Sequence, residues 1–316
     1  MDADDCARLN EAYGEKGFRY FPYVLGERAE SRTFYVANWP PSCGLYKKRV
    51  DFWSRYTPVN LRKLTVVREV PVTTVALDNC LKDEGIAAPD FIKVDVEGAE
   101  LEVLRGGRNA LAKALGVLVE ARFSNANGCP LFAETDIFMR ENRFRLYDFT
   151  YIGKYPRKHM PDPRAWLNGE EVSWPEDYGQ LIWADALYFA DPIEYPETIL
   201  QAGLDDPVKL IKFISLLELF GCVDYAAELV TAFPAVISKV LPASEALDLL
   251  TPTVKGRKVS YDQYVRAAKN GTEAMINELA PADPPPPPPP PEPRITIEQP
   301  GSFFAKARAA FTRVFK

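Results

Sequence analysis

The sequence predicts an α/β protein, and two observations on residues 1–191 carry this prediction. Short apolar runs alternate there with segments of helical spacing, as they do when helices connect the strands of a sheet. The clearest run, Phe91 to Val96, is nearly continuous, which is typical of a parallel strand covered on both faces. The segment after it has the pattern of a helix that opens at Gly98 and is stopped by the glycine at 106.

The other elements of this region are predicted from the same two patterns. Apolar residues at helical spacing predict helices up to Gly14, at Ala76 to Lys82 and at Leu131 to Glu141. Runs of β-branched and aromatic residues predict strands at Phe18 to Leu25, Thr33 to Ala37, Val66 to Val75, Val117 to Ala121, Phe144 to Phe149 and Ile182 to Phe189. The stretch Tyr155 to Tyr178, rich in proline and aromatic residues, is predicted to be a loop over the carboxyl edge of the sheet.

Residues 196–280 are predicted to be a helical extension. Asp206 followed by Pro207 provides an N-cap and a first-turn proline, and Gly221 ends this helix. A second helix is expected at Tyr225 to Phe233. The two helices predict an α-helical hairpin appended to the α/β domain.

The last two segments have strongly biased compositions. Residues 281–300 are predicted to be a proline-rich linker, because the eight consecutive prolines from Pro284 to Pro291 favour the polyproline II conformation. Residues 301–316 place phenylalanines on one helical face and lysines and arginines on the other, which predicts a C-terminal basic amphipathic helix. Such a helix binds a membrane surface or a groove between helices. A disordered tail is the alternative, since so short a helix is marginal in water.

Composition limits the classes of function. The chain has 316 residues, is 47% hydrophobic and carries a net charge of -6, so we expect small substrates and no nucleic-acid partner. Its five cysteines are scattered and form no CxxC pair, which predicts neither a disulfide framework nor a metal site. The sequence shows no signal peptide and no membrane span. We therefore predict a cytoplasmic protein, peripheral at the inner membrane surface if the tail binds lipid.

Acidic residues mark the candidate site. Asp95 and Glu97 follow one predicted strand, and Glu120 lies at the end of the next. In open α/β sheets ligands bind beyond the carboxyl ends of the strands, so these acids are expected at one edge. Two alternatives stay open: Asp95 and Glu97 cap the following helix, or Glu120 forms a salt bridge with a neighbouring cation. The single histidine, His159, is interpreted as a surface residue.

Three segments of the chain resemble one known family. The central segment is DFIKVDVEGAELEVLRGG at 90–107, with PVTTVALDNCL upstream at 71–81 and VLVEARF downstream at 117–123. Together, and in this order, they resemble the FkbM family of S-adenosylmethionine-dependent methyltransferases over about residues 2–191. The resemblance implies a class I methyltransferase (Rossmann-like) sheet and S-adenosylmethionine as the cofactor. It also implies O-methylation of a hydroxyl on a sugar, a glycan or a secondary metabolite.

The resemblance also suggests roles for individual residues. Methyl transfer to a hydroxyl needs a group that takes the proton, and Asp95 and Glu97 are the catalytic candidates. Asp95 and Leu25 are candidates for contact with the cofactor, Leu25 by its place in the family topology. Candidates for acceptor binding are Glu120, Ser42 in a small-residue segment, and Trp174, which belongs to an aromatic group with Trp166, Tyr178 and Trp183.

The sequence departs from the family pattern in one respect. A methyltransferase of this class begins with a strand and a glycine-rich turn that holds the cofactor, and no GxGxG occurs in this chain. We therefore expect an N-terminally incomplete domain in 1–191, whose strand Phe91 to Val96 forms an exposed sheet edge. Cofactor binding by the chain alone is expected to be weak or absent, which leaves open whether it is an enzyme. The alternative is a catalytically inactive remnant that acts as a binding or scaffold protein through its proline-rich arm and basic tail.

Overall fold

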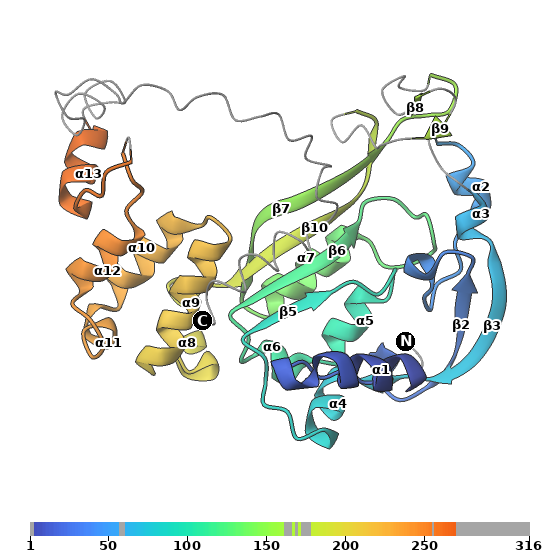
Figure 1. Ribbon diagram of the computed structural model, residues 1–316, viewed down its shortest axis with the longest axis horizontal. Coiled ribbons are helices and arrows are strands. Elements are labelled where there is room, and N and C mark those ends of the chain that lie inside the picture. The colour runs from blue at the N-terminus through green and yellow to red at the C-terminus, as the bar shows by residue number, and fades with distance from the viewer. Residues whose placement is uncertain are drawn as a thin grey trace. The chain divides into compact units, whose positions relative to one another are not determined.

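The computed structural model describes residues 3–56, 61–160, 166–167, 170–171, 178–254 and 256–269. The chain divides into two compact units, Met1–Gly203 and Leu204–Lys316. The first unit combines several β-sheets with helices, which confirms the prediction of a mixed α/β protein (Figure 1).

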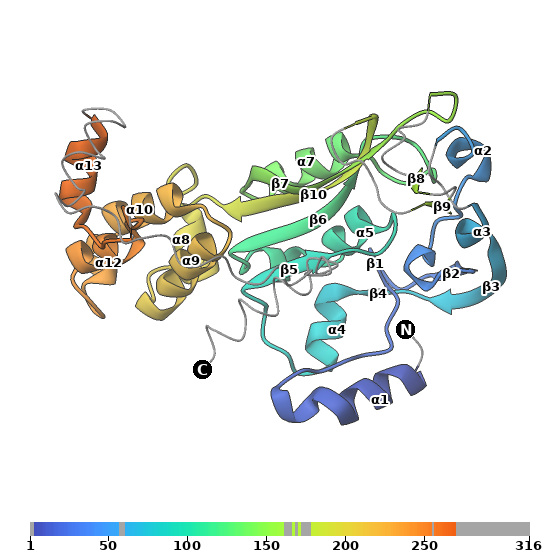
Figure 2. The ribbon, with the colours of Figure 1, turned by 45° about the horizontal axis from the view of Figure 1, so that its top comes forward.

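The largest sheet of the first unit has four strands in the order β5-β6-β10-β7. They are β5 (Phe91–Val94), β6 (Gly116–Arg122), β10 (Gln180–Ala190) and β7 (Phe144–Tyr155). β5 runs parallel to β6, whereas β10 is antiparallel to both of its neighbours (Figure 2). Within the described residues, β5 is therefore an edge strand of this sheet.

The core of the first unit surrounds β6 and β10. Six of the seven residues of β6 are buried, as the apolar run predicts. Helices α5 (Glu100–Arg105) and α7 (Phe132–Glu141) contribute further buried side chains. The hydroxyl of Tyr188 on β10 donates a hydrogen bond to Asp136 on α7 at 3.2 Å, which fixes that helix against the sheet. The central strands thus form a rigid platform for the residues at their ends.

A second group of elements precedes the main sheet in sequence. It contains the helices α1 (Ala3–Tyr13), α2 (Val50–Trp53), α3 (Leu61–Leu64) and α4 (Leu77–Asp83) and the 3-10 turns η1 (Gly14–Lys16) and η2 (Pro40–Ser42). β2 (Ser31–Ala37) and β3 (Val66–Thr73) form an antiparallel ribbon, and β1 (Leu25–Gly26) pairs in parallel with β4 (Val75–Ala76). Later in the chain, β8 (Trp166–Leu167) pairs with β9 (Glu170–Glu171), and α8 (Glu197–Ala202) ends the unit.

Close backbone contacts join this group to the central helices. A Cβ atom on Gly106, at the end of α5, would lie only 2.4 Å from the carbonyl oxygen of Gly26 in β1. Asp78 of α4 accepts hydrogen bonds at 2.9 Å from the amides of Asn109 and Ala110 in α6 (Arg108–Leu111). Gly106 therefore allows β1 to pack closely, and Asp78 binds the free amides at the start of α6.

The structure corrects three predicted elements of this unit. Phe18 to Leu25 is not a strand, because only Leu25 and Gly26 pair with another strand. The stretch Val66 to Val75 is interrupted at Thr74, whose hydroxyl donates to the Arg28 carbonyl at 2.7 Å. The central helix does not open at Gly98 but begins at Glu100.

The second unit is helical in its described part. Its helices are α9 (Pro207–Leu219), α10 (Val223–Ala232), α11 (Pro234–Ile237), α12 (Ala243–Leu250) and α13 (Tyr261–Lys269). Asp206 caps α9 by accepting from the Val208 amide at 2.8 Å. Leu210, Phe213 and Leu229 are among its buried residues. The domain boundaries and the appended hairpin remain predictions.

The proline-rich linker and the basic tail lie outside the described residues. Among the helices that the structure does describe, none has the length and apolar character needed to cross a bilayer.

Candidate functional site

The turn between β5 and α5 has an unusual backbone. Glu97 and Gly98 both have positive φ angles, 62° and 121°. Glu100 is buried and folds back onto this turn, where it accepts hydrogen bonds from the amides of Val96 at 3.1 Å and Gly98 at 3.0 Å. A non-glycine residue in the left-handed region costs roughly 1–2 kcal/mol, and such strain is concentrated at functional sites. The turn therefore holds Glu97 in a position that the backbone alone does not favour.

The small-residue segment at 42–45 covers this turn. A Cβ atom on Gly44 would lie 3.2 Å from the Cβ of Glu97 and 3.3 Å from the Val96 carbonyl oxygen. Gly98 is confined on its other side, since a Cβ there would lie 3.1 Å from the Cβ of Cys129 and 3.3 Å from the ring of Tyr46. A side chain at either position would be tightly packed, and Gly98 also has a φ of 121° that favours glycine.

Acidic and basic side chains alternate at the carboxyl ends of β5 and β6. Arg122 donates to Glu97 at 3.0 Å and to Glu120 at 2.6 Å, and Lys48 also donates to Glu97. The side chains of Lys48 and Arg122 are 4% and 5% exposed. Buried charges persist when they are paired, and each of these two cations has a carboxylate partner.

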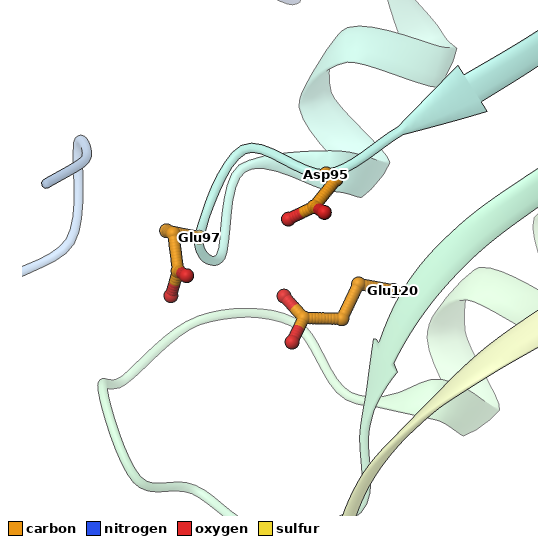
Figure 3. A group of neighbouring side chains, drawn as sticks. All are labelled: Asp95, Glu97 and Glu120. Atoms are coloured by element: carbon orange, nitrogen blue, oxygen red, sulfur yellow. The ribbon is translucent and has the colours of Figure 1, made fainter. Parts of the chain in front are cut away.

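Three carboxylates converge at this edge. Figure 3 shows Asp95 and Glu97, from the chain after β5, and Glu120, from β6, pointing toward one another. Each offers an oxygen atom, and these atoms lie within 4.8 Å of one another. Such a group could hold a cation, but Arg122 and Lys48 already supply positive charge there. We assign no metal to it.

Burial changes the protonation of Glu120 and of the neighbouring Glu100. It raises the pKa of Glu120 to about 8, helped by the charges of Glu97, Glu100 and Asp95 and opposed by Arg122. Burial also raises the pKa of Glu100. A single arginine is shared between two of these carboxylates, so it offsets only part of the cost of burying them.

A cavity of about 340 Å³ opens onto this network. Its polar lining comes from Ser42, Lys48, Lys63, Asp95, Glu97, Glu120, Arg122 and Asp185. Its apolar lining comes from Trp39, Pro41, Trp53, Leu64, Tyr155 and Trp183. The ring centroids of Trp53 and Tyr155 are 5.2 Å apart, and the indole of Trp183 donates to the Tyr155 hydroxyl at 3.3 Å. The cavity thus combines carboxylates with a packed aromatic wall.

Comparison with known proteins identifies the part of the chain that builds this site. Residues 9–146 match the family described as the methyltransferase FkbM domain. The chain carries an FkbM methyltransferase domain. This match confirms the resemblance predicted from the central segments.

A curated relative points in the same direction. The chain is 38% identical over 58 residues to the hexuronic acid methyltransferase AglP of Haloferax volcanii. That stretch is 18% of this chain and 24% of the relative, so the chain spans about a quarter of the length of the relative it matches. No solved structure matches the chain significantly.

The structure brings four of the predicted site residues of the FkbM domain together. Asp95, Glu97, Glu120 and Ser42 all line the one cavity. Leu25 lies in β1 and does not belong to the lining.

The aromatic candidates do not all line the cavity. Trp174 lies outside the described residues, and so does the side chain of Trp166. Trp183 lines the cavity, whereas Tyr178 is exposed and does not. His159 is exposed, as expected of a surface residue.

The open alternatives for the acids are now distinguished by their contacts. Glu100, and neither Asp95 nor Glu97, accepts the hydrogen bonds that the turn amides of Val96 and Gly98 donate. Glu120 does form the salt bridge with Arg122 that the sequence allowed.

Sequence reasoning missed several residues of the cavity. Lys48 and Trp53 come from segments that carry no local sign of a site. Asp185 had a signal, because it is an acid inside the apolar strand predicted at Ile182 to Phe189. A charge at such a position is costly unless it has a partner or a function.

Proposed function

We propose that this FkbM domain is an S-adenosylmethionine-dependent methyltransferase that methylates a hydroxyl of a sugar, a glycan or a secondary metabolite. The observation that carries the proposal is the cavity at the carboxyl ends of β5 and β6, where carboxylates face an aromatic wall. The activity is supported by the match over residues 9–146.

We propose further that the main sheet is part of a class I, Rossmann-like sheet. The parallel pairing of β5 with β6 and the antiparallel course of β10 support this proposal. Ligands of open α/β sheets bind beyond the carboxyl ends of the strands, which is where the cavity lies.

One exposed carboxylate of the cavity suits the charge of the expected cofactor. S-adenosylmethionine supplies a methyl group on a positively charged sulfur, and a cation is stabilised near a carboxylate. Lys48 and Arg122 pair with Glu97 and Glu120, whereas the side chain of Asp95 is 46% exposed and open to a ligand. We propose Asp95 as a contact of the cofactor and retain Leu25 as a second candidate.

The same cavity fits an acceptor that carries hydroxyl groups. Carboxylates such as Glu120 and Glu97 accept hydrogen bonds from hydroxyls, and the Ser42 hydroxyl can donate or accept. Aromatic faces pack against the apolar face of a sugar, a role for which Trp53, Tyr155 and Trp183 are placed. The relative AglP is a hexuronic acid methyltransferase, so hexuronic acids are worth testing among the acceptors.

The protein holds these groups in fixed positions. Lys48 and Arg122 fix Glu97 from two sides, and Arg122 also fixes Glu120. Preorganised charges need no rearrangement when a reaction takes place, which is the main contribution that a methyltransferase active site makes.

The proposal is tested by methyl transfer from labelled S-adenosylmethionine to a panel of neutral sugars, hexuronic acids and glycans. We expect at least one acceptor to be labelled by the full chain, and Asp95→Asn to lower the rate at least tenfold. Asp148→Asn is the control, because Asp148 is an exposed acid of β7 away from the cavity. No labelling of any acceptor, together with no cofactor binding by isothermal titration, would favour an inactive binding or scaffold protein.

We also propose that the protein works in the cytoplasm. The five cysteines form no disulfide, and four of them are buried as free thiols, which suits a reducing compartment. For residues 301–316 we propose peripheral binding to an anionic membrane surface. Liposome co-sedimentation of the intact protein and of a chain ending at Pro281 tests this, and equal sedimentation of the two would contradict it.

A further inference from the structure

Asp185 differs from the other acids of the cavity in having no hydrogen-bond or ion-pair partner among the described residues. Asp95 pairs with Lys93 at 3.0 Å, and Glu97 and Glu120 share Arg122. For the Asp185 carboxylate, the described part of the chain provides neither a hydrogen bond nor an ion pair. It is therefore the acid of this lining whose oxygen atoms are free for a ligand.

The position of Asp185 gives it no role in stabilising the fold. It lies in the middle of β10, between Ala184 and Ala186, which are fully buried. Across the sheet it is directly opposite Glu120 on β6 and Tyr151 on β7. Burial disfavours the charge of a carboxylate that has no hydrogen-bond partner, and it raises the pKa of Asp185. The strand would be more stable with a neutral residue at this position, so folding does not account for the acid.

The charged groups around Asp185 come from three strands. Lys93 belongs to β5 and Asp95 follows it, whereas Arg122 and Glu120 belong to β6. β7 contributes the neutral ring of Tyr151, whose centroid lies 5.1 Å from that of Trp183. Burial raises the pKa of Asp185, and the charge of Asp95 adds to this, while Lys93 and Arg122 oppose it. Asp185 is thus a stronger base than an aspartate in water.

We infer that Asp185 is the catalytic base that receives the proton of the acceptor hydroxyl. The inference rests on the proposed function. In the step it describes, a lone pair of the hydroxyl oxygen forms the new bond to the methyl carbon, and the carbon–sulfur bond breaks with its electron pair left on sulfur. The hydroxyl proton moves to a carboxylate oxygen of Asp185, so that charge and atoms balance. Glu120, already bonded to Arg122, binds a second hydroxyl instead.

The inference is tested with Asp185→Asn, which keeps the shape of the side chain and removes its basicity. General-base catalysis contributes about 10²–10⁴-fold, so we expect kcat to fall at least 100-fold and KM to change less than fivefold, with the pH dependence of the rate lost. Asp185→Glu should recover part of the rate. Because a partly buried charge is removed, Asp185→Asn should melt at or above the temperature of the unsubstituted protein.

A second measurement does not depend on turnover. NMR of the protein labelled with ¹³C at aspartate Cγ identifies Asp185 by the signal that is lost in Asp185→Asn. This signal should titrate at a higher pH than those of the other aspartates. The pH of its titration should change when an acceptor found in the transfer assay is replaced by the same sugar without its reacting hydroxyl. Asp148→Asn, the matched control, should retain full activity. If Asp185→Asn kept the rate and the pH profile of the unsubstituted protein, this inference would be overturned and the proposed function would stand. Absence of methyl transfer by the unsubstituted protein would overturn it together with the proposed function.

Discussion

The buried carboxyl of Glu120 predicts how the stability of the first unit depends on pH. Its pKa of about 8 in the folded protein lies above its ordinary value of 4.5. Between these values the folded protein binds more protons than the unfolded chain, so the free energy of unfolding falls as the pH rises. The contribution of protonated Glu120 is complete below pH 4.5 and is lost as the pH passes 8. Glu120→Gln, which cannot ionise, removes this contribution to the slope.

The size of the effect follows from the same values. One unit of difference between the folded and the unfolded pKa corresponds to about 1.36 kcal/mol. Between about pH 5 and about pH 7.5, Glu120 can therefore change the free energy of unfolding by at most about 3 kcal/mol. We therefore expect the unsubstituted protein to lose more stability than Glu120→Gln over this interval, by up to about 3 kcal/mol.

Urea unfolding followed by tryptophan fluorescence measures this difference, because Trp53 and Trp183 line the same cavity. Glu11→Gln, a change of an exposed acid on α1, serves as the control and should show the slope of the unsubstituted protein. Equal slopes for the Glu120→Gln variant and the unsubstituted protein would refute the argument that burial dominates over Arg122 at this site.

Three further changes test the packing and charges around the site. Gly106→Ala should destabilise the unit by about 1–3 kcal/mol in thermal melting, because its Cβ would meet backbone, whereas Gly14→Ala, with open space around it, should melt like the original. Asp78→Ala should cost about 1 kcal/mol in urea unfolding through loss of the α6 cap, and Asp78→Asn less; equal midpoints for both would contradict that role. Lys48→Met should lower methyl transfer at least tenfold by releasing Glu97, and an unchanged rate would show that Arg122 is sufficient.

The sequence predicted the central elements because their signals are local. The runs at 91–96 and 117–121 are nearly continuously apolar, as is typical of strands covered on both faces. Both strands lie where the sequence predicted them. The error at the start of α5 has a physical cause. Glu97 and Gly98 take left-handed backbone angles, and Glu100 binds their turn, but the sequence pattern of these residues is also compatible with a helix.

The predicted strand at Phe18 to Leu25 is wrong, because a local pattern does not show whether a strand has a partner. Its aromatic composition favours a strand, yet a strand also needs a partner along its length. Only its last residue and Gly26 have one, in β4, and the backbone of Tyr20 is instead bonded by the side chain of Asn10. Strand preference depends on tertiary context, which composition does not contain.

The sequence predicted the residues of the candidate site that lie at the ends of strands. Asp95, Glu97 and Glu120 follow neighbouring strands, so the edge where they meet could be inferred from their order. Lys48 reaches Glu97 across 49 residues of sequence, and no local pattern records such a contact. Asp185 belongs to the last strand of the sheet, whose place beside β6 depends on the topology of the whole unit.

The cavity takes its lining from segments that are distant in sequence. Trp39, Lys48 and Leu64 precede the main sheet, Glu120 lies in β6, and Tyr155 and Asp185 belong to β7 and β10. Contacts of such long separation form late, because chain entropy opposes them until the intervening parts are in place. A molecule that binds there holds these segments at once and stabilises the native state by mass action, by about 2.7 kcal/mol at a concentration 100 times its dissociation constant. A thermal-shift screen of candidate acceptors would therefore report binding before any turnover assay has been established.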